Sequence, residues 1–163
     1  MDRSQCLIRK ENNMKPISIQ IQRTNKQSSE EICSAFLDTE RWSEFEGYSI
    51  LPGIEHAQFE VRTPEYVGSR IKVQNKDGSG HVEEIMEWDT ARKVVLKFQD
   101  FTPPLKHLAT HFIETWEFQK TAAGTLTIRR MDMFPIGFMG WLTLLPISRL
   151  MKKAFEKNAE RSA

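Results

Sequence analysis

The chain has 163 residues, which predicts a single domain whose core is large enough to need no disulfide or metal support. Its 23 basic residues balance 22 acidic ones, so overall charge gives no reason to expect nucleic acid or an anionic membrane as a partner. The two cysteines, Cys6 and Cys33, show no zinc or redox spacing, and we expect a cytoplasmic protein without a metal or cofactor.

The chain begins with a segment that lacks the features of a folded element. Residues 1–14 contain basic residues but no apolar run of the kind found in secretory signals. We therefore predict a disordered tail over residues 1–14, followed by one domain over residues 15–161.

A strand and two short helices are expected first. Three isoleucines alternate with polar residues over positions 17–22, which is typical of a strand with one covered face. Ser28 and the acidic residues that follow it predict the start of a short helix that ends at Leu37. A second short helix is expected over residues 38–45, with Trp42 and Phe45 on one side.

Six further segments alternate like strands and are separated by turn residues, over residues 57–61, 67–73, 82–88, 94–98, 110–118 and 126–134. In the segment over residues 82–88, Glu84 shares a face with Val82, Met86 and Trp88, so we expect its carboxylate to point inward. Consecutive hairpins with helices gathered at two points predict an α+β fold with a curved antiparallel sheet of about seven strands.

The segment over residues 110–118 carries aromatic rings and one carboxylate on a single face, namely Phe112, Glu114, Trp116 and Phe118. An antiparallel register about the turn at residues 121–124 places Trp116 near Ile128 and Glu114 opposite Arg130. An unpaired charge on the apolar side of a sheet would cost several kcal/mol. We therefore expect the Glu and the Arg to pair, or to meet a ligand or water.

A long helix is expected at the C-terminal end. The apolar stretch over residues 134–147 has about 14 residues, whereas a membrane-spanning helix needs about 20. It is flanked by Asp132 and Arg149, and apolar residues continue in a helical stripe as far as Phe155. A core helix that covers the concave side of the sheet is the expected structure.

Three segments resemble the opening of the START/SRPBCC superfamily: Ile19-Gln20-Ile21, then Ser29-Glu30-Glu31-Ile32, then residues 36–45 with Asp38, Trp42 and Phe45 in an Asp-x-x-x-Trp-x-x-Phe pattern. The chain resembles in particular the polyketide cyclase/dehydrase and lipid-transport group, which is related to the birch-pollen allergens, over about residues 15–160. The resemblance implies a helix-grip architecture with a deep apolar cavity. Different members use this cavity to carry lipids, sterols, hormones, polyketides or quinones.

Together these observations predict that the chain binds or transports a hydrophobic small molecule, such as a lipid or polyketide, in an internal cavity. Apolar and aromatic side chains would surround the ligand, and a few charged groups would fix its polar end. The expected ligand-binding residues are Glu84, Trp88, Phe98, Phe112, Glu114, Trp116, Ile128, Arg130, Met139 and Leu142.

Three alternatives remain open at this point. The aromatic rings could fill a sealed core. The chain could also be a polyketide cyclase or aromatase, in which Glu84, having no assigned cation, is the candidate general acid or base. Finally, the cations of the basic end could dock an acidic protein surface or lipid headgroups, as in a co-chaperone-like interaction module; they are Arg149, Lys152, Lys153, Lys157 and Arg161.

The histidines give no support for a metal site. His107 and His111 are four residues apart, but the prolines before them and the strand pattern around them argue against a helix that would bring them together. His56 and His81 are expected on outward positions of their strands. The sequence contains no motif for a nucleophile, a P-loop or a dinucleotide turn.

Overall fold

The computed structural model describes residues 14–161, so all of the predicted tail over residues 1–14 except Met14 lies outside the described part. The elements in chain order are β1 (Ile17–Asn25), α1 (Ser29–Leu37), the 3-10 helix η1 (Thr39–Glu44), β2 (Gly47–Tyr48), β3 (Leu51–Pro52), β4 (Ile54–Val61), β5 (Arg70–Asn75), β6 (Gly80–Asp89), β7 (Lys93–Gln99), the 3-10 helix η2 (Leu105–His107), β8 (Ala109–Thr121), β9 (Gly124–Pro135) and α2 (Gly137–Arg161).

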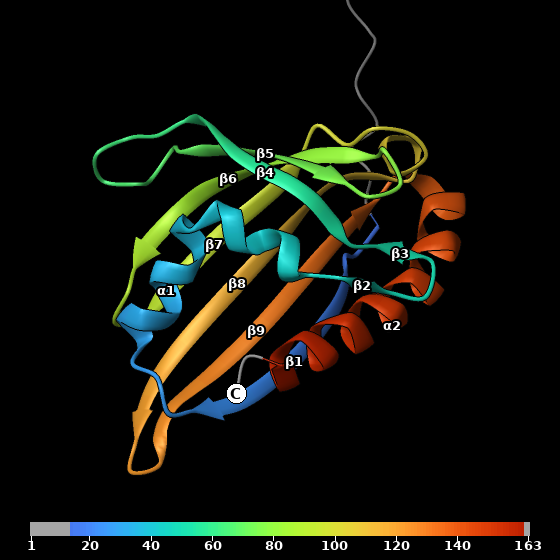
Figure 1. Cartoon of the computed structure of the whole chain (residues 1–163). Helices are drawn as coiled ribbons and strands as arrows, with labels where there is room; N and C mark the ends of the chain where they lie inside the picture. Colours follow the sequence, from blue (N-terminus) through green and yellow to red (C-terminus); the bar gives the residue numbers. More distant parts are fainter. Residues whose placement is uncertain (1–13, 162–163) are drawn as a thin grey trace, which may run out of the picture.

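Seven of these strands form one antiparallel sheet in the order β1-β9-β8-β7-β6-β5-β4. The consecutive strands β4 to β9 are neighbours, and β1 pairs with β9, so the first strand of the fold lies beside the last. Figure 1 shows the sheet bending, with α2 lying along the β1 edge and α1 and η1 lying across the sheet. The predicted α+β helix-grip architecture is confirmed.

The sequence pattern at the start of α1 explains its position after β1. The backbone N–H of Glu31 donates to Ser28 Oγ at 3.2 Å, and the Glu31 carboxylate accepts from the backbone N–H of Ser28 at 2.8 Å. This reciprocal capping box satisfies two of the free N–H groups at the helix start. The second expected helix forms as the 3-10 helix η1.

Helix α2 contacts β1 and β9 of the sheet and also the small β2–β3 ribbon. Its first turns lie so close to the segment before β8 that a Cβ on Gly140 would be 2.4 Å from the carbonyl oxygen of Leu108. Leu144 and Phe155 of α2 are buried against Phe112 and Met131 of the sheet. Among residues 14–161, no helix has the length and apolar character that crossing a bilayer requires.

The register of the β8–β9 hairpin differs by one residue from the expected one. Thr121 pairs with Gly124, so the loop contains only Ala122 and Ala123. Gly124 adopts φ 129°, and a Cβ there would lie 2.1 Å from the Asn25 carbonyl oxygen, so the tight turn requires glycine. Because side chains alternate along a strand, this one-residue difference exchanges the two faces of β9.

The predicted inward direction of Ile128 and Arg130 is therefore wrong. Trp116 is opposite Arg129, and Glu114 is opposite Met131. Arg130 lies on the outer face, where its Nε donates to Asp132 Oδ1 at 3.0 Å.

A β-bulge in β6 changes the face of a second predicted residue. The pairing with β7 shifts between Ile85 and Glu87, so Met86 is the extra residue. Before the bulge, Glu83 and not Glu84 points inward; after it, Trp88 returns to the inner side. The expected inward direction of Glu84 is therefore wrong, and its carboxylate accepts from Gln99 Nε2 at 2.7 Å instead.

Candidate ligand-binding site

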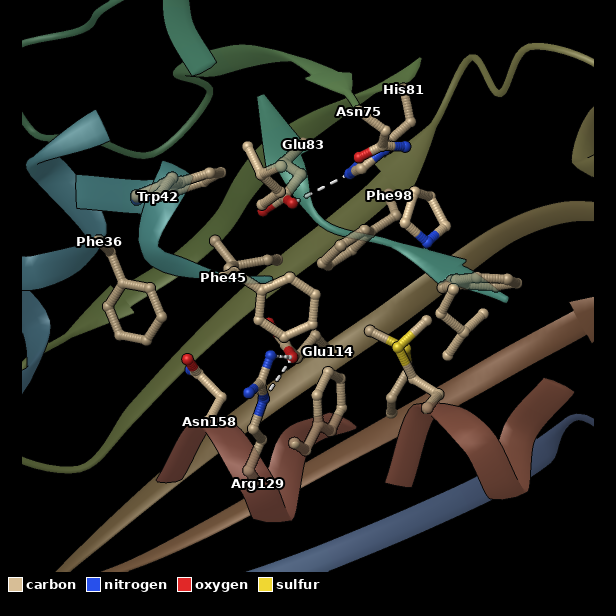
Figure 2. Close-up of a pocket in the computed structure, with 18 of the residues that line it drawn as sticks. Phe36, Trp42, Phe45, Asn75, His81, Glu83, Phe98, Glu114, Arg129 and Asn158 are labelled. Atoms are coloured by element: carbon tan, nitrogen blue, oxygen red, sulfur yellow. Dashed lines mark hydrogen bonds and ion pairs between the residues drawn. The ribbon is translucent and has the colours of Figure 1, made fainter. Parts of the chain in front are cut away.

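A cavity of about 600 Å³ lies between the inner face of the sheet, the α1–η1 segment and the C-terminal half of α2. This volume falls within the roughly 300–1,000 Å³ that is typical of small-molecule sites. Figure 2 shows rings and aliphatic side chains from several elements surrounding the space. The apolar lining includes Phe36, Trp42, Phe45, Leu96, Phe98, Phe112, Trp116, Met131, Ile147, Met151 and Phe155.

Glu114 and Arg129 form a buried ion pair on the sheet floor of this cavity. Glu114 is only 2% exposed, and its Oε1 accepts from Nε and Nη2 of Arg129 at 2.6 Å each. The Arg129 guanidinium also lies 3.4 Å from the centre of the Phe155 ring and 4.5 Å from that of Trp116. Because both charges are satisfied locally, the pair provides polarity inside an apolar cavity without a free charge.

Glu83 and His81 form a second polar pair, held by β6. Glu83 is 5% exposed, and His81 Nε2 lies 3.0 Å from its Oε1. The His81 ring stacks on Phe98, with ring centroids 5.2 Å apart, which fixes its orientation. Burial raises the pKa of Glu83, and the hydrogen bond and charge of His81 offset part of this rise.

One hydrogen-bond donor in the lining has no partner. Trp116 Nε1 is buried and makes no hydrogen bond to any described residue. The ring packs edge-on against Phe36, with centroids 4.9 Å apart. Since buried N–H groups are nearly always paired, this indole is a donor available to a polar ligand atom.

Polar side chains also line the end of the cavity near the start of α1. Asn25 Nδ2 donates to Thr127 Oγ1 at 3.1 Å, and Arg23 and Asn158 lie in the same lining. Arg23 projects from β1 on the same face as Ile21 and has no ion pair within the described part of the chain.

The structure brings together only part of the predicted binding set. Phe98, Phe112, Glu114 and Trp116 line the cavity. Trp88 is on the inner side but packs against Phe36 and Tyr66 in a neighbouring apolar cluster. The remaining predicted contacts lie outside the lining: Glu84, Ile128, Arg130, Met139 and Leu142.

Met139 and Leu142 are wrong because α2 presents a different face to the cavity. Their side chains are 67% and 48% exposed, respectively. The lining residues of the helix include instead Ile147, Met151 and Phe155, which follow each other at four-residue spacing, and the lining continues with Asn158 and Ala159. This four-residue spacing is present in the sequence, but the first half of the helix is apolar on several sides, so the pattern did not identify which face lines the cavity.

Glu83, His81 and Arg129 were missed for a different reason, since each lies next to a residue that was assigned to the wrong face. No group of three or more His, Cys, Asp or Glu side chains is placed to hold a metal within the described residues. Cys33 is on the buried face of α1, and burial raises its pKa to about 12, which leaves an unreactive thiol.

No protein-family model matches the sequence, and no curated protein matches it significantly. Solved structures, in contrast, match most of the chain. Ginseng major latex-like protein 151 from Panax ginseng is 14% identical, with a TM-score of 0.60 over 86% of this chain and 97% of its own. A START superfamily protein from Mycobacterium smegmatis is also 14% identical, with a TM-score of 0.60 over 92% of this chain and 100% of its own.

A protein from Thermus thermophilus reaches a TM-score of 0.63 at 16% identity and covers 86% of this chain and 90% of its own. At such low identity, these likenesses establish the fold and leave the ligand open. The architecture, the cavity between sheet and helix, and these neighbours agree: the chain has the helix-grip fold of the START/SRPBCC superfamily.

Proposed function

We propose that this protein binds a hydrophobic small molecule, such as a lipid or polyketide, inside the cavity between the sheet and α2. The observation that carries the proposal is the cavity of about 600 Å³, whose aromatic lining surrounds two buried polar pairs. A sealed core would place apolar atoms in this space at close-packed density. An apolar hollow with a few fixed polar groups has instead the composition of a ligand site.

The arrangement of polar groups suggests an amphipathic ligand. Its apolar body would contact Phe98, Phe112 and Met151, and its polar atoms would meet the indole N–H of Trp116 or the Glu83–His81 pair. Glu114 and Arg129 are already paired with each other, so to a ligand this pair would contribute one additional hydrogen bond and no free charge.

Displacement of a fluorescent apolar probe tests this proposal. We expect N-phenyl-1-naphthylamine to bind and to be displaced by a fatty acid, a sterol or an aromatic polyketide. Met151→Trp adds ring volume inside the cavity and should weaken probe binding by about tenfold or more, where tenfold corresponds to about 1.4 kcal/mol of lost contact.

Leu142→Trp is the matched control, because it adds a similar ring on the exposed side of the same helix. Equal probe binding by the two variants would contradict an interior site. In a separate experiment, native mass spectrometry of protein purified from its own host would identify a co-purifying ligand directly.

The interaction-module alternative also stays a proposal. Arg149, Lys152, Lys153 and Lys157 are exposed along the outer side of α2, as expected for the solvated face of an amphipathic helix. Salt-dependent binding to anionic vesicles would support docking through these cations, and indifference to such vesicles would argue against it. Cytoplasmic location likewise remains a prediction from the sequence.

A further inference from the structure

The cavity contains two buried carboxylates in different environments. Glu114 is bound twice by the Arg129 guanidinium, whereas Glu83 has no lysine or arginine partner among residues 14–161 and is contacted only by His81. Figure 2 shows the two pairs at separate places around the space, with the Phe45 and Phe98 rings between them. A site that pairs one carboxylate with a guanidinium and leaves the other without a permanent cation has the arrangement found in acid–base catalysis.

Stability alone does not account for Glu83. A buried carboxyl without a permanent cation costs free energy in the folded state, and an apolar or amide side chain would avoid that cost. The site nevertheless holds the group in place, because His81 Nε2 lies within hydrogen-bond distance of it and the His81 ring is itself stacked on Phe98. Groups that cost stability and are held in one orientation within a cavity are characteristic of functional sites.

We propose that Glu83 is a general base that removes a proton from the carbon next to the carbonyl group of a hydrophobic ketone bound in the cavity. The carbon–hydrogen bond breaks, its electron pair forms the carbon–carbon double bond, and the carbonyl π electrons move to oxygen. The Glu83 carboxyl exchanges this proton with solvent and returns a proton to carbon, so the net reaction is exchange of the carbon-bound hydrogen with solvent through an enolate. His81 is a positioning residue that orients the Glu83 carboxylate.

The surroundings of Glu83 fit this role. The charged groups that face it are His81 on its own strand, Glu114 on β8 and Arg129 on β9, while Arg41 and Glu44 of η1 lie in the lining and pair with each other. Burial raises the pKa of Glu83, and a carboxylate whose pKa is raised is a stronger base. The enolate oxygen would receive a hydrogen bond from the unpartnered Trp116 indole or from the cationic Arg129.

This inference rests on the proposed function, because the ketone must first enter the cavity. The probe is 2-tetralone, whose exchange of C1 hydrogens for deuterium in D₂O is followed by NMR, while displacement of N-phenyl-1-naphthylamine measures binding separately. The protein should accelerate exchange over buffer. Glu83→Gln should remove about 100-fold or more of that acceleration, since general bases contribute about 10²–10⁴-fold, while probe binding is retained.

Glu84→Gln is the matched control, because this neighbour lies on the outer face of β6 and should exchange 2-tetralone like the unmodified protein. His81→Leu should shift the pH profile of exchange upward, because loss of the His81 hydrogen bond raises the pKa of Glu83 further. A merely structural histidine would leave that profile unchanged.

Three results would overturn the proton-transfer role. The first is that 2-tetralone displaces the probe but the protein does not accelerate its deuterium exchange. The second is that Glu83→Gln accelerates this exchange as much as the unmodified protein does. The third is that the probe binds but 2-tetralone does not displace it. Absence of any probe binding would instead contradict the proposed function itself.

Discussion

Replacing Arg129 by Met should strongly destabilise the protein, because it leaves the buried Glu114 carboxyl group without its cationic partner. Glu114 is 2% exposed, and removing one partner of a buried ion pair typically costs about 3–5 kcal/mol. The guanidinium also contacts the Phe155 and Trp116 rings, interactions of about 0.5–2 kcal/mol each. Met keeps the apolar stem and compensates part of the ring contact, so we expect a total loss of about 4 kcal/mol.

Urea unfolding, followed by tryptophan fluorescence, measures this loss. With a slope of about 2 kcal/mol/M, a loss of about 4 kcal/mol lowers the midpoint by about 2 M. Adding Glu114→Gln removes the stranded charge, so the double variant should be more stable than the sum of the single losses predicts, by about 1–3 kcal/mol.

Arg130→Met is the matched control, because it removes the neighbouring arginine on the outer face. Its partner Asp132 lies outside the cavity, and an exposed pair contributes about 0–1 kcal/mol. Equal losses in Arg129→Met and Arg130→Met, or strict additivity with Glu114→Gln, would refute the reasoning about the buried pair.

Three further predictions concern the core, the buried thiol and the pH dependence of stability. Leu144→Ala should cost about 2–5 kcal/mol in urea unfolding, because Leu144 is fully buried, whereas Leu142→Ala on the exposed side should change stability little; similar losses would be inconsistent with the observed orientation of α2. In a Cys6→Ser background, Cys33 should react with Ellman's reagent at pH 8 only on unfolding, since burial raises its pKa to about 12; rapid labelling of the folded protein would exclude this environment. Burial raises the pKa of Glu83 in the folded state above the ordinary value of 4.5, so its contribution to stability is fully present at lower pH and is lost as pH rises through the folded-state pKa. The melting temperature of Glu83→Gln, measured relative to that of the unmodified protein, should therefore increase between pH 4 and pH 8. A difference in melting temperature that stays constant over this range would contradict the raised pKa.

Local sequence patterns were sufficient for the order of the seven sheet strands and of α1, η1 and α2, whereas the short β2–β3 ribbon and η2 were not predicted. The alternation over β1, the capping residues of α1 and the aromatic face of β8 depend on nearest neighbours along the chain, and the structure has these features as expected. Phe112, Glu114 and Trp116 were therefore assigned to the inner face from the sequence alone.

The partner of Glu114 required knowledge of strand pairing. β9 carries apolar residues on both faces, so its alternation did not distinguish Arg129 from Arg130. The length of the loop at Ala122 and Ala123 decided between them, because a one-residue slip reverses every side chain of a strand. The bulge at Met86 likewise decided between Glu83 and Glu84.

The face of α2 that lines the cavity was also decided by packing. An apolar helix surface allows several orientations, and the contact of Gly140 with Leu108 together with the burial of Leu144 selects one of them. Local patterns along the chain were enough to assign the sheet strands and the main helices and to place charged groups among aromatic rings. Which charges meet inside the cavity depends on strand register, on the bulge and on the rotation of α2, and these follow from contacts between segments far apart in the chain.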